Sequence, residues 1–171
     1  MAQTVRILGF AGSLRKGSYN KALLRAAGEL APKGAELRVF DLEGIPPFNE
    51  DLESNPPAKV KDFKAEIKAA DALLIATPEY NFSMPGVLKN AIDWGTRPYG
   101  DNAWAGKPAA IMGASTGQFG TVRAQLHLRQ VLLDGRIHPH TGRLRLERGV
   151  ERGGGLGDGL VQIPPDGAGG R

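Results

Sequence analysis

The distribution of apolar and polar positions divides the chain into short strands and amphipathic helices. Two continuous apolar runs, 72–76 and 108–113, have the length of strands that are buried on both faces of a parallel sheet. Residues 5–10 and 35–42 are also predicted to be strands. Apolar positions recur with helical spacing in four other segments. The predicted helices cover residues 19–30, 58–69, 86–94 and 123–133.

Predicted strands and helices alternate along the chain, in the order β-α-β-α-β-α-β-α. This alternation predicts an α/β fold with a parallel sheet and right-handed crossovers. The apolar stripes of the first, second and fourth helices are predicted to consist of Ala22, Leu23, Ala26, Ala27 and Leu30, of Val60, Phe63 and Ile67, and of Leu126, Val131 and Leu132.

Three loops rich in small, polar and aromatic residues follow predicted strands. They cover residues 9–20, 77–85 and 114–120. In sheets of this type, ligands bind beyond the carboxyl ends of the strands. The coincidence of three such loops at one edge of the sheet therefore predicts a ligand site there.

The first loop has the composition of a phosphate-binding turn. It joins a strand directly to a helix, whose first N–H groups lack partners within the helix and lie at the positive end of its dipole. Gly12 and Gly17 have the spacing of a P-loop, but Ser18 stands where its lysine is needed, and the G-x-G-x-x-G fingerprint is absent. A turn without a ligand is the alternative. The side chains that can bind a single phosphomonoester, which is the kind of phosphate in FMN, are Ser13, Arg15, Ser18 and Asn20.

The second and third loops can supply a flat slot with amide groups along one edge, as a planar heterocycle requires. Backbone groups of residues 79–82 can provide the donors and acceptors, and Tyr80 or Phe82 can close one side. Residues 115–117 can form the opposite wall, because a glycine among them allows close approach of the backbone. The alternative for both aromatic residues is packing in the core.

Composition excludes several classes of protein. The 171 residues, of which 41% are apolar, suffice for one domain with a hydrophobic core. The chain has no Cys, so disulfides, thiolate catalysis and thiolate metal sites are excluded. The net charge of +4 is spread along the chain, which argues against nucleic-acid binding. We see neither a signal-peptide pattern nor an apolar run of about 18 residues, and we expect a cytoplasmic protein without membrane contact.

Nucleophilic and proton-transferring side chains do not form a recognisable catalytic set. The sequence has no Ser-His-Asp set, carboxylate pair or H-E-x-x-H motif, so a cofactor must carry the chemistry of any enzyme built on this chain. His127, His138 and His140 lack the carboxylates that would complete a metal site, and we predict none. Trp94 and Trp104 are expected in the core or at a subunit interface.

Several sequence blocks resemble a known family. They are G-S-L-R-K-G-S-Y-N at 12–20, P-E-Y-N-F-S-M-P-G at 78–86, L-K-N-A-I-D-W at 88–94, and Lys107-Pro108 with G-A-S at 113–115. Over residues 4–133 the chain resembles the NADPH-dependent FMN reductase family, and within it the chromate and quinone reductase branch. The resemblance implies a flavodoxin-like three-layer sandwich of strand order 2-1-3-4-5. It also implies FMN-dependent transfer of hydride from NADPH or NADH to quinones, flavins, azo compounds or metal oxyanions such as chromate.

The resemblance also implies the roles of individual residues. The loop 12–20 would hold the FMN phosphate, residues 78–81 would line the isoalloxazine mainly through their backbone, and Ser115 would contact its other side. No side chain is expected to be catalytic, because the flavin carries the chemistry by a ping-pong mechanism. Family members are homodimers or homotetramers, and we expect Tyr80 and Arg123 near the subunit contact. The expected cofactor-binding residues are Ser13, Arg15, Lys16, Gly17, Ser18, Tyr19, Asn20, Pro78, Glu79, Tyr80, Asn81, Phe82, Ser115, Thr116 and Gly117.

The chain departs from the family pattern after Leu133. The family continues with a fifth strand and a last helix, whereas here a Gly- and Arg-rich segment without helical periodicity follows. We therefore expect a flavodoxin-like FMN-binding domain over residues 1–133 and an atypical segment over 134–171. In that segment only a weak strand at 136–138 is predicted, and the last helix has no sequence support.

Two other functions are compatible with these motifs. One is a flavodoxin-like electron carrier that has no pyridine-nucleotide step. Such carriers are usually strongly acidic, so the net charge of +4 argues against this alternative. The other is a non-catalytic remnant, which the unusual ending suggests. The leading hypothesis is an FMN-dependent NAD(P)H oxidoreductase.

Overall fold

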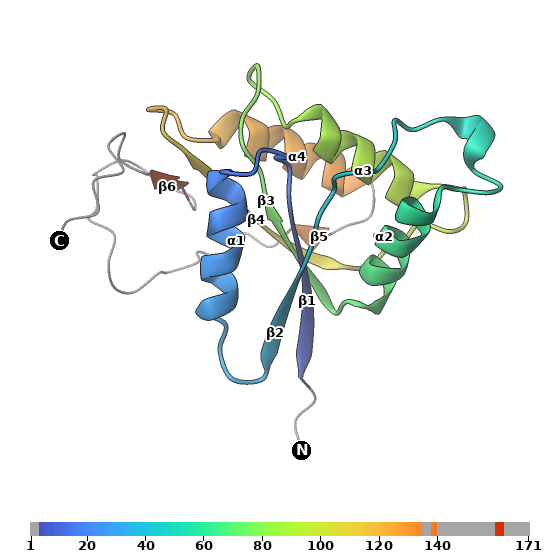
Figure 1. The fold of residues 1–171 in the computed structure, drawn as a ribbon, viewed down its shortest axis with the longest axis horizontal. Helices are drawn as coiled ribbons and strands as arrows, with labels where there is room; N and C mark the ends of the chain where they lie inside the picture. The colour runs from blue at the N-terminus through green and yellow to red at the C-terminus, as the bar shows by residue number, and fades with distance from the viewer. Residues whose placement is uncertain (1–3, 135–137, 140–159, 163–171) are drawn as a thin grey trace.

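The chain folds around a parallel β-sheet with helices on both faces (Figure 1). A computed structural model describes residues 4–134, 138–139 and 160–162. From one edge, the strands are β2 (Ala35–Phe40), β1 (Val5–Ala11), β3 (Ala72–Ala76), β4 (Pro108–Ser115) and β5 (His138–Pro139). The helices are α1 (Tyr19–Glu29), α2 (Ala58–Ala69), α3 (Gly86–Thr96) and α4 (Val122–Asp134), with a 3-10 turn η1 at Glu50–Leu52. This order confirms the predicted α/β fold with a parallel sheet.

The two faces of the sheet are covered unequally. Helices α2, α3 and α4 pack on one face and α1 on the other (Figure 1). In β1, Leu8 and Phe10 belong to the larger apolar cluster under α2–α4, whereas Ile7 and Ala11 belong to the smaller cluster under α1. Burial on both faces explains why the central strands are continuous apolar runs.

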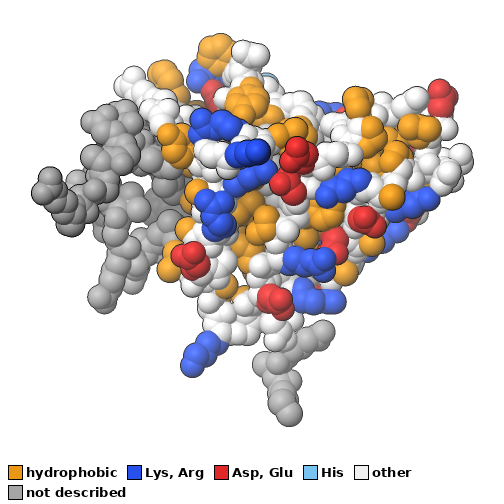
Figure 2. Space-filling view, in the orientation of Figure 1, with side chains coloured by type: hydrophobic (Ala, Val, Ile, Leu, Met, Phe, Trp, Pro, Cys, Tyr) orange, Lys and Arg blue, Asp and Glu red, His pale blue; other side chains and the backbone are white. Residues whose placement is uncertain are grey.

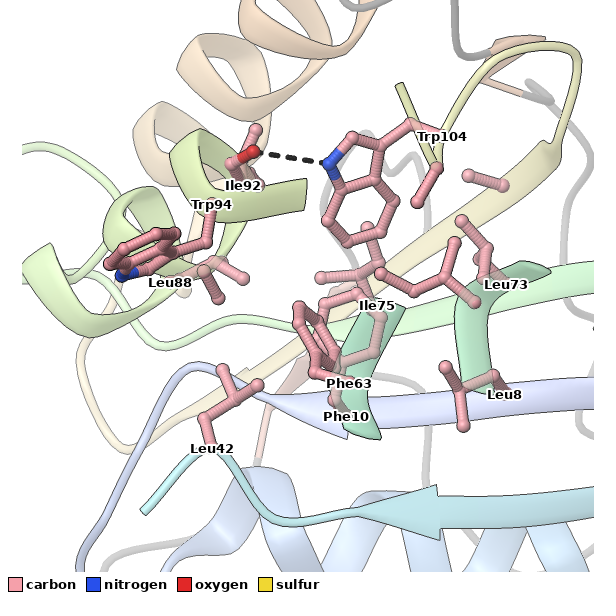
Figure 3. Close-up of a cluster of buried hydrophobic side chains, with 14 of the residues drawn as sticks. Leu8, Phe10, Leu42, Phe63, Leu73, Ile75, Leu88, Ile92, Trp94 and Trp104 are labelled. Carbon is pink, nitrogen blue, oxygen red and sulfur yellow. Dashed lines mark hydrogen bonds between the residues drawn. The ribbon is translucent and has the colours of Figure 1, made fainter. Parts of the chain in front are cut away.

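Aromatic side chains form the centre of the larger cluster (Figure 3). The ring centroids of Phe10, Phe63 and Trp104 lie 5.5–5.9 Å apart. The indole of Trp104 lies directly against Gly95, where any side chain would collide with it, and its Nε1 donates to the Ile92 carbonyl at 3.1 Å. Trp94 and Trp104 are 1% and 0% exposed. Of the two predicted locations, the core and a subunit interface, both residues therefore occupy the core.

Parallel pairing brings the ends of three strands to the same edge of the sheet. Ala11 of β1 is in register with Ala76 of β3, and Ala76 is in register with Met112 of β4. The pairing continues one residue further, because the Gly12 N–H donates to the Ala76 carbonyl and the Thr77 N–H to the Met112 carbonyl, each at 2.9 Å. The three predicted ligand loops therefore begin side by side.

The outer side of β4 pairs with two short segments. Residues 108–109 pair with β5, and residues 113–115 pair with β6 (Leu160–Gln162). Of the strand predicted at 136–138, His138 lies in β5, and the other two residues lie outside the described part of the chain. Within the described ranges, no helix is both long and apolar enough to span a bilayer.

Two predicted helix stripes need correction. In α1 the fully buried side chain is Leu24, which the predicted stripe omitted, whereas Ala26 and Leu30 are exposed. The helix is rotated so that Asn20 and Leu24, one turn apart, both face the sheet. In α4, Leu128 and Leu132 face the core, and Leu126 is 59% exposed.

Candidate functional site

The loop between β1 and α1 is lined with free backbone donors. Ser18 caps the helix, with its Oγ accepting from the Lys21 N–H at 3.3 Å. The neighbouring donors remain available where the positive end of the α1 dipole lies. The N–H groups around this turn that donate to no described residue include those of Lys16, Gly17, Tyr19 and Asn20.

Arg15 and Ser13 add polar side chains to the same loop. One Arg15 Nη donates to the Gly17 carbonyl at 2.5 Å, and the guanidinium lies 5.3 Å from the centroid of the Tyr19 ring. Ser13 is 4% exposed, and its hydroxyl has no hydrogen-bond partner among the described residues. Figure 2 shows Lys and Arg side chains gathered over this end of α1. The loop therefore combines free N–H groups, a buried hydroxyl and positive charge.

Asn20 connects the first loop to the third. Its side chain is 2% exposed, with Nδ2 donating to the Ala114 carbonyl and Oδ1 accepting from the Ala114 N–H, both at 3.0 Å. Both polar ends of the amide are therefore occupied by the backbone of β4. In the structure this side chain links two loops, and its predicted contact with phosphate stays a prediction; the backbone N–H of Asn20 donates to no described residue.

The second loop ends in a tight turn over residues 80–83. Tyr80 and Ser83 exchange two backbone hydrogen bonds, of 2.9 and 3.0 Å, across Asn81 and Phe82. Both central residues have positive φ, 50° and 64°, which is uncommon for an aromatic residue. The Tyr80 and Phe82 side chains are 51% and 65% exposed, so the alternative that they pack in the core is wrong.

Glu79 points away from this turn, toward α4. Its carboxylate accepts from the N–H groups of Arg123 and Ala124 at 2.9 and 3.2 Å, and from the Arg123 guanidinium. What Glu79 can present to the edge of the sheet is therefore its backbone, and the main-chain lining of the ring stays a prediction.

The third loop lies close to the second because of Gly113. A Cβ at this position would collide with Thr121 and would lie 2.7 Å from the Thr77 carbonyl oxygen. Beyond it, the Ser115 hydroxyl accepts from the Gly117 N–H at 3.0 Å, which closes a small turn. Thr116 and Gly117 are exposed at the same edge. The second and third loops thus start close together, and their role as the two walls of a ring site stays a prediction.

These features fit FMN better than the other phosphate-bearing cofactors. The β1–α1 loop offers free N–H groups, hydroxyls and one Arg, which suits a single phosphate group. Beside it, a Cβ on Gly17 would meet no atom within 4 Å, so this part of the loop is open to a ligand. The turn at 80–83 and the wall at 115–117 stand at the same edge, where a flat ring can lie.

One contact near the site was not predicted. The Ser83 Oγ lies 3.0 Å from the His127 Nδ1, and both residues line a groove of about 740 Å³ between α3 and α4. The two residues are 44 positions apart, and no local motif signals their meeting. The hydrogen bonds of the Glu79 side chain to the start of α4 were not predicted either. They also join residues that lie far apart in the sequence, 44 and 45 positions.

A doubly wound parallel sheet with these loops at its carboxyl edge defines a flavodoxin-like flavin-binding protein. The sequence matches the NADPH-dependent FMN reductase family over residues 5–141, and the chain belongs to that family.

Characterised relatives have consistent names. The chain is 55% identical over 141 residues to an NAD(P)H-dependent FMN reductase of Pseudomonas aeruginosa, covering 81% of this chain and 75% of that protein. It is 50% identical over 127 residues to a 2-hydroxy-1,4-benzoquinone reductase of a Burkholderia species, covering 74% and 69%. Among solved structures, the flavoenzyme NAD(P)H:(acceptor) oxidoreductase FerB of Paracoccus denitrificans matches with a TM-score of 0.76 and 42% identity, covering 80% and 75%.

These findings confirm the family, the fold and the enzyme class predicted from the sequence. The chain is an FMN-dependent NAD(P)H oxidoreductase with NAD(P)H as its hydride donor. The alternative of an electron carrier without a pyridine-nucleotide step does not fit this family.

Proposed function

We propose that the chain reduces quinones with electrons from NAD(P)H, by alternate binding of donor and acceptor at one flavin face. The main support for the flavin site is that three loops converge at one edge of the sheet. Asn20 joins the first loop to the third, and the second and third loops pack closely at Gly113. The substrate class is supported by relatives that are named for quinone reduction, at 50% and 47% identity. Chromate, azo compounds and free flavins remain predicted acceptors.

The phosphate of FMN would be held by the β1–α1 loop. The free N–H groups of residues 16, 17, 19 and 20 supply neutral donors, and Arg15 supplies a charge-assisted one. Ser13 and Ser18 are 4% and 5% exposed and add hydroxyls. The Asn20 side chain acts through Ala114 and keeps the third loop in place.

The ring would lie between the second and third loops. Backbone groups of Pro78, Glu79 and Asn81 would meet its polar edge, and residues 115–117 would form the other wall. Tyr80 and Phe82 are exposed beside this position and can cover the ring or a bound nicotinamide. Bound FMN would supply the redox chemistry, and the chain contributes position and hydrogen bonding at the ring edge.

Larger-scale features of the protein are also part of the proposal. We propose that residues 1–133 form the FMN-binding domain, because every assigned contact lies within them. We also propose a homodimer or homotetramer, supported by the exposed Leu126 on α4 and by the groove between α3 and α4. Arg123, in the first turn of α4, and the exposed Tyr80 are expected near the contact. The cytoplasm is the proposed location, since reduced nicotinamide nucleotides are available there.

Steady-state kinetics test the substrate class. Oxidation of NADPH by the FMN-loaded protein should require an added benzoquinone. Reciprocal plots at several quinone concentrations should be parallel, as alternate binding demands. A protein whose flavin is reduced by NADPH but which does not accelerate NADPH oxidation in the presence of quinone would contradict the quinone assignment.

A further inference from the structure

Glu79 and Arg123 form a buried link between the second loop and α4, which we call the latch. The Glu79 side chain is 8% exposed, and its carboxylate receives the N–H groups of Arg123 and Ala124. The same carboxylate also accepts from the Arg123 Nε and Nη2 at 2.5 Å each. The hydrogen bonds are charge-assisted and partly buried, with the carboxylate side of the pair shielded from water.

The latch supplies a hydrogen-bond acceptor for backbone N–H groups at the start of α4. The first N–H groups of a helix lack partners within it, and a negative charge at that end interacts favourably with the helix dipole. Here a carboxylate 44 residues earlier in the chain provides both. Because the same residue belongs to the proposed flavin-binding backbone, the position of that backbone is fixed to a rigid helix.

Arg123 also contacts the strained turn from the outside. Its guanidinium carbon lies 4.1 Å from the ring centroid of Phe82 and 5.3 Å from that of Phe119. Phe82 has a φ of 64°, a conformation that a large side chain rarely adopts and that surrounding contacts must maintain. Glu79 anchors the guanidinium, and the guanidinium stacks on Phe82.

We propose that Glu79 and Arg123 are positioning residues whose side chains preset the turn at 80–83 for the flavin ring, without contacting the ring. This inference rests on the proposed FMN site. A loop that is already fixed loses less conformational freedom when a ligand binds, so the latch strengthens FMN binding and sets the ring geometry. The carboxylate of Glu79 is therefore a support for the binding backbone rather than a ligand of the cofactor.

The test compares Glu79→Gln with Asp71→Asn in the full chain. Asp71 is a matched control, because its carboxylate also accepts from a backbone N–H and a guanidinium, both of Arg6, but at the opposite end of the strands. FMN affinity is measured by quenching of flavin fluorescence, and visible circular dichroism of bound FMN reports the ring geometry. Glu79→Gln should weaken FMN binding about tenfold and alter the visible spectrum, whereas Asp71→Asn should change neither.

Arg123→Met provides a second route if the first variant does not fold. Arg123→Met removes the guanidinium, whose side chain is 38% exposed, and leaves the Glu79 carboxylate with the backbone N–H groups of residues 123 and 124 as donors. It should weaken FMN binding in the same direction, and the double variant should be no weaker than Glu79→Gln alone, since both changes break one link. Wild-type affinity and an unchanged spectrum in folded Glu79→Gln or Arg123→Met would overturn the latch. Failure of the wild-type protein to bind FMN would instead overturn the proposed function.

Discussion

Single residues of the loop before α1 are proposed to hold the phosphate of FMN. The N–H groups there are neutral donors, and Arg15 is the cation whose guanidinium the structure places on the loop backbone, at the Gly17 carbonyl. Lys16 is the neighbouring cation, and it is exposed. The two residues therefore separate a specific contact from a general effect of positive charge.

Arg15→Ala should weaken FMN binding about tenfold, because a charge-assisted hydrogen bond to phosphate is lost. Lys16→Ala removes the same charge but only its backbone is assigned to the site, so binding should weaken by about twofold or less. Titration of the flavin-free protein with FMN measures both. Equal losses in the two variants would mean that charge alone attracts the phosphate, and the Arg15 contact would be wrong.

At this scale, local motifs predicted the loops but not the contacts between them. The hydroxyl-rich turn and the exposed aromatic residues of the second loop follow from residue type and order. The Asn20 side chain was predicted to bind the phosphate, and no role was predicted for the Glu79 side chain; in the structure they bind backbone 94 and 44 residues away. Which partner a polar side chain takes depends on how the elements pack, and spacing along the chain does not contain that information.

Elements are held together by apolar packing, supplemented by a few polar links. One such link joins α2 to the segment after α3. Lys64 is 7% exposed, and its ammonium group donates to the carbonyls of Arg97 and Asp101 and to the Asp101 carboxylate. Hydrogen bonds from Lys64 and then Lys68 hold the pKa of Asp101 below its ordinary range.

Asp101→Asn should lower the free energy of unfolding by roughly 1 kcal/mol at neutral pH. The folded-state pKa is lower than the unfolded-state pKa, so the carboxylate stabilises the fold above the unfolded-state value. This contribution disappears as the pH falls through the folded-state pKa. Urea unfolding at neutral and acid pH should therefore show a difference from wild type that vanishes in acid.

Asp62→Asn is the control for this prediction, because Asp62 is exposed on the same helix and has no partner among the described residues. It should leave the free energy of unfolding unchanged at both pH values. A destabilisation by Asp101→Asn that persists in acid would show that packing, rather than the ion pair, is responsible.

Element types and positions were predictable because burial on two faces imposes clear periods on the sequence. The helix at Ala58–Ala69 and the strand at Ala72–Ala76 occur within the predicted limits. The rotation of α1 was not predictable, because neighbouring apolar residues such as Leu23 and Leu24 satisfy either orientation. Packing against β1, β3 and β4 selects Leu24.

The whole molecule presents apolar side chains on α4 that a single chain does not cover. Leu126 is 59% exposed on this helix. Isolated exposed leucines are common, and Leu30 at the end of α1 is 64% exposed. In the proposed oligomer, Leu126 lies at the subunit contact and Leu30 does not.

Leu126→Glu should convert the oligomer to a smaller species, because a buried charge at a subunit contact is unfavourable. Leu30→Glu should leave the oligomeric state unchanged, since it lies away from the proposed contact. Size-exclusion chromatography with light scattering measures both. If both variants retain the wild-type mass, the contact does not involve this face of α4.

At the same scale, alternation of elements indicated a parallel sheet, but strand order came from the resemblance to a family. Periodicity contains no information on which strands are neighbours. The structure and the similarity to FerB agree with the order that the resemblance implied.

The most direct measurement is the visible absorption spectrum of the purified protein during anaerobic addition of FMN and then NADPH. The account predicts saturable uptake of FMN into the protein, followed by bleaching of the bound flavin by NADPH alone and recovery of the colour on addition of a quinone. Protein that takes up no FMN, or whose bound flavin keeps its colour in excess NADPH, would contradict it.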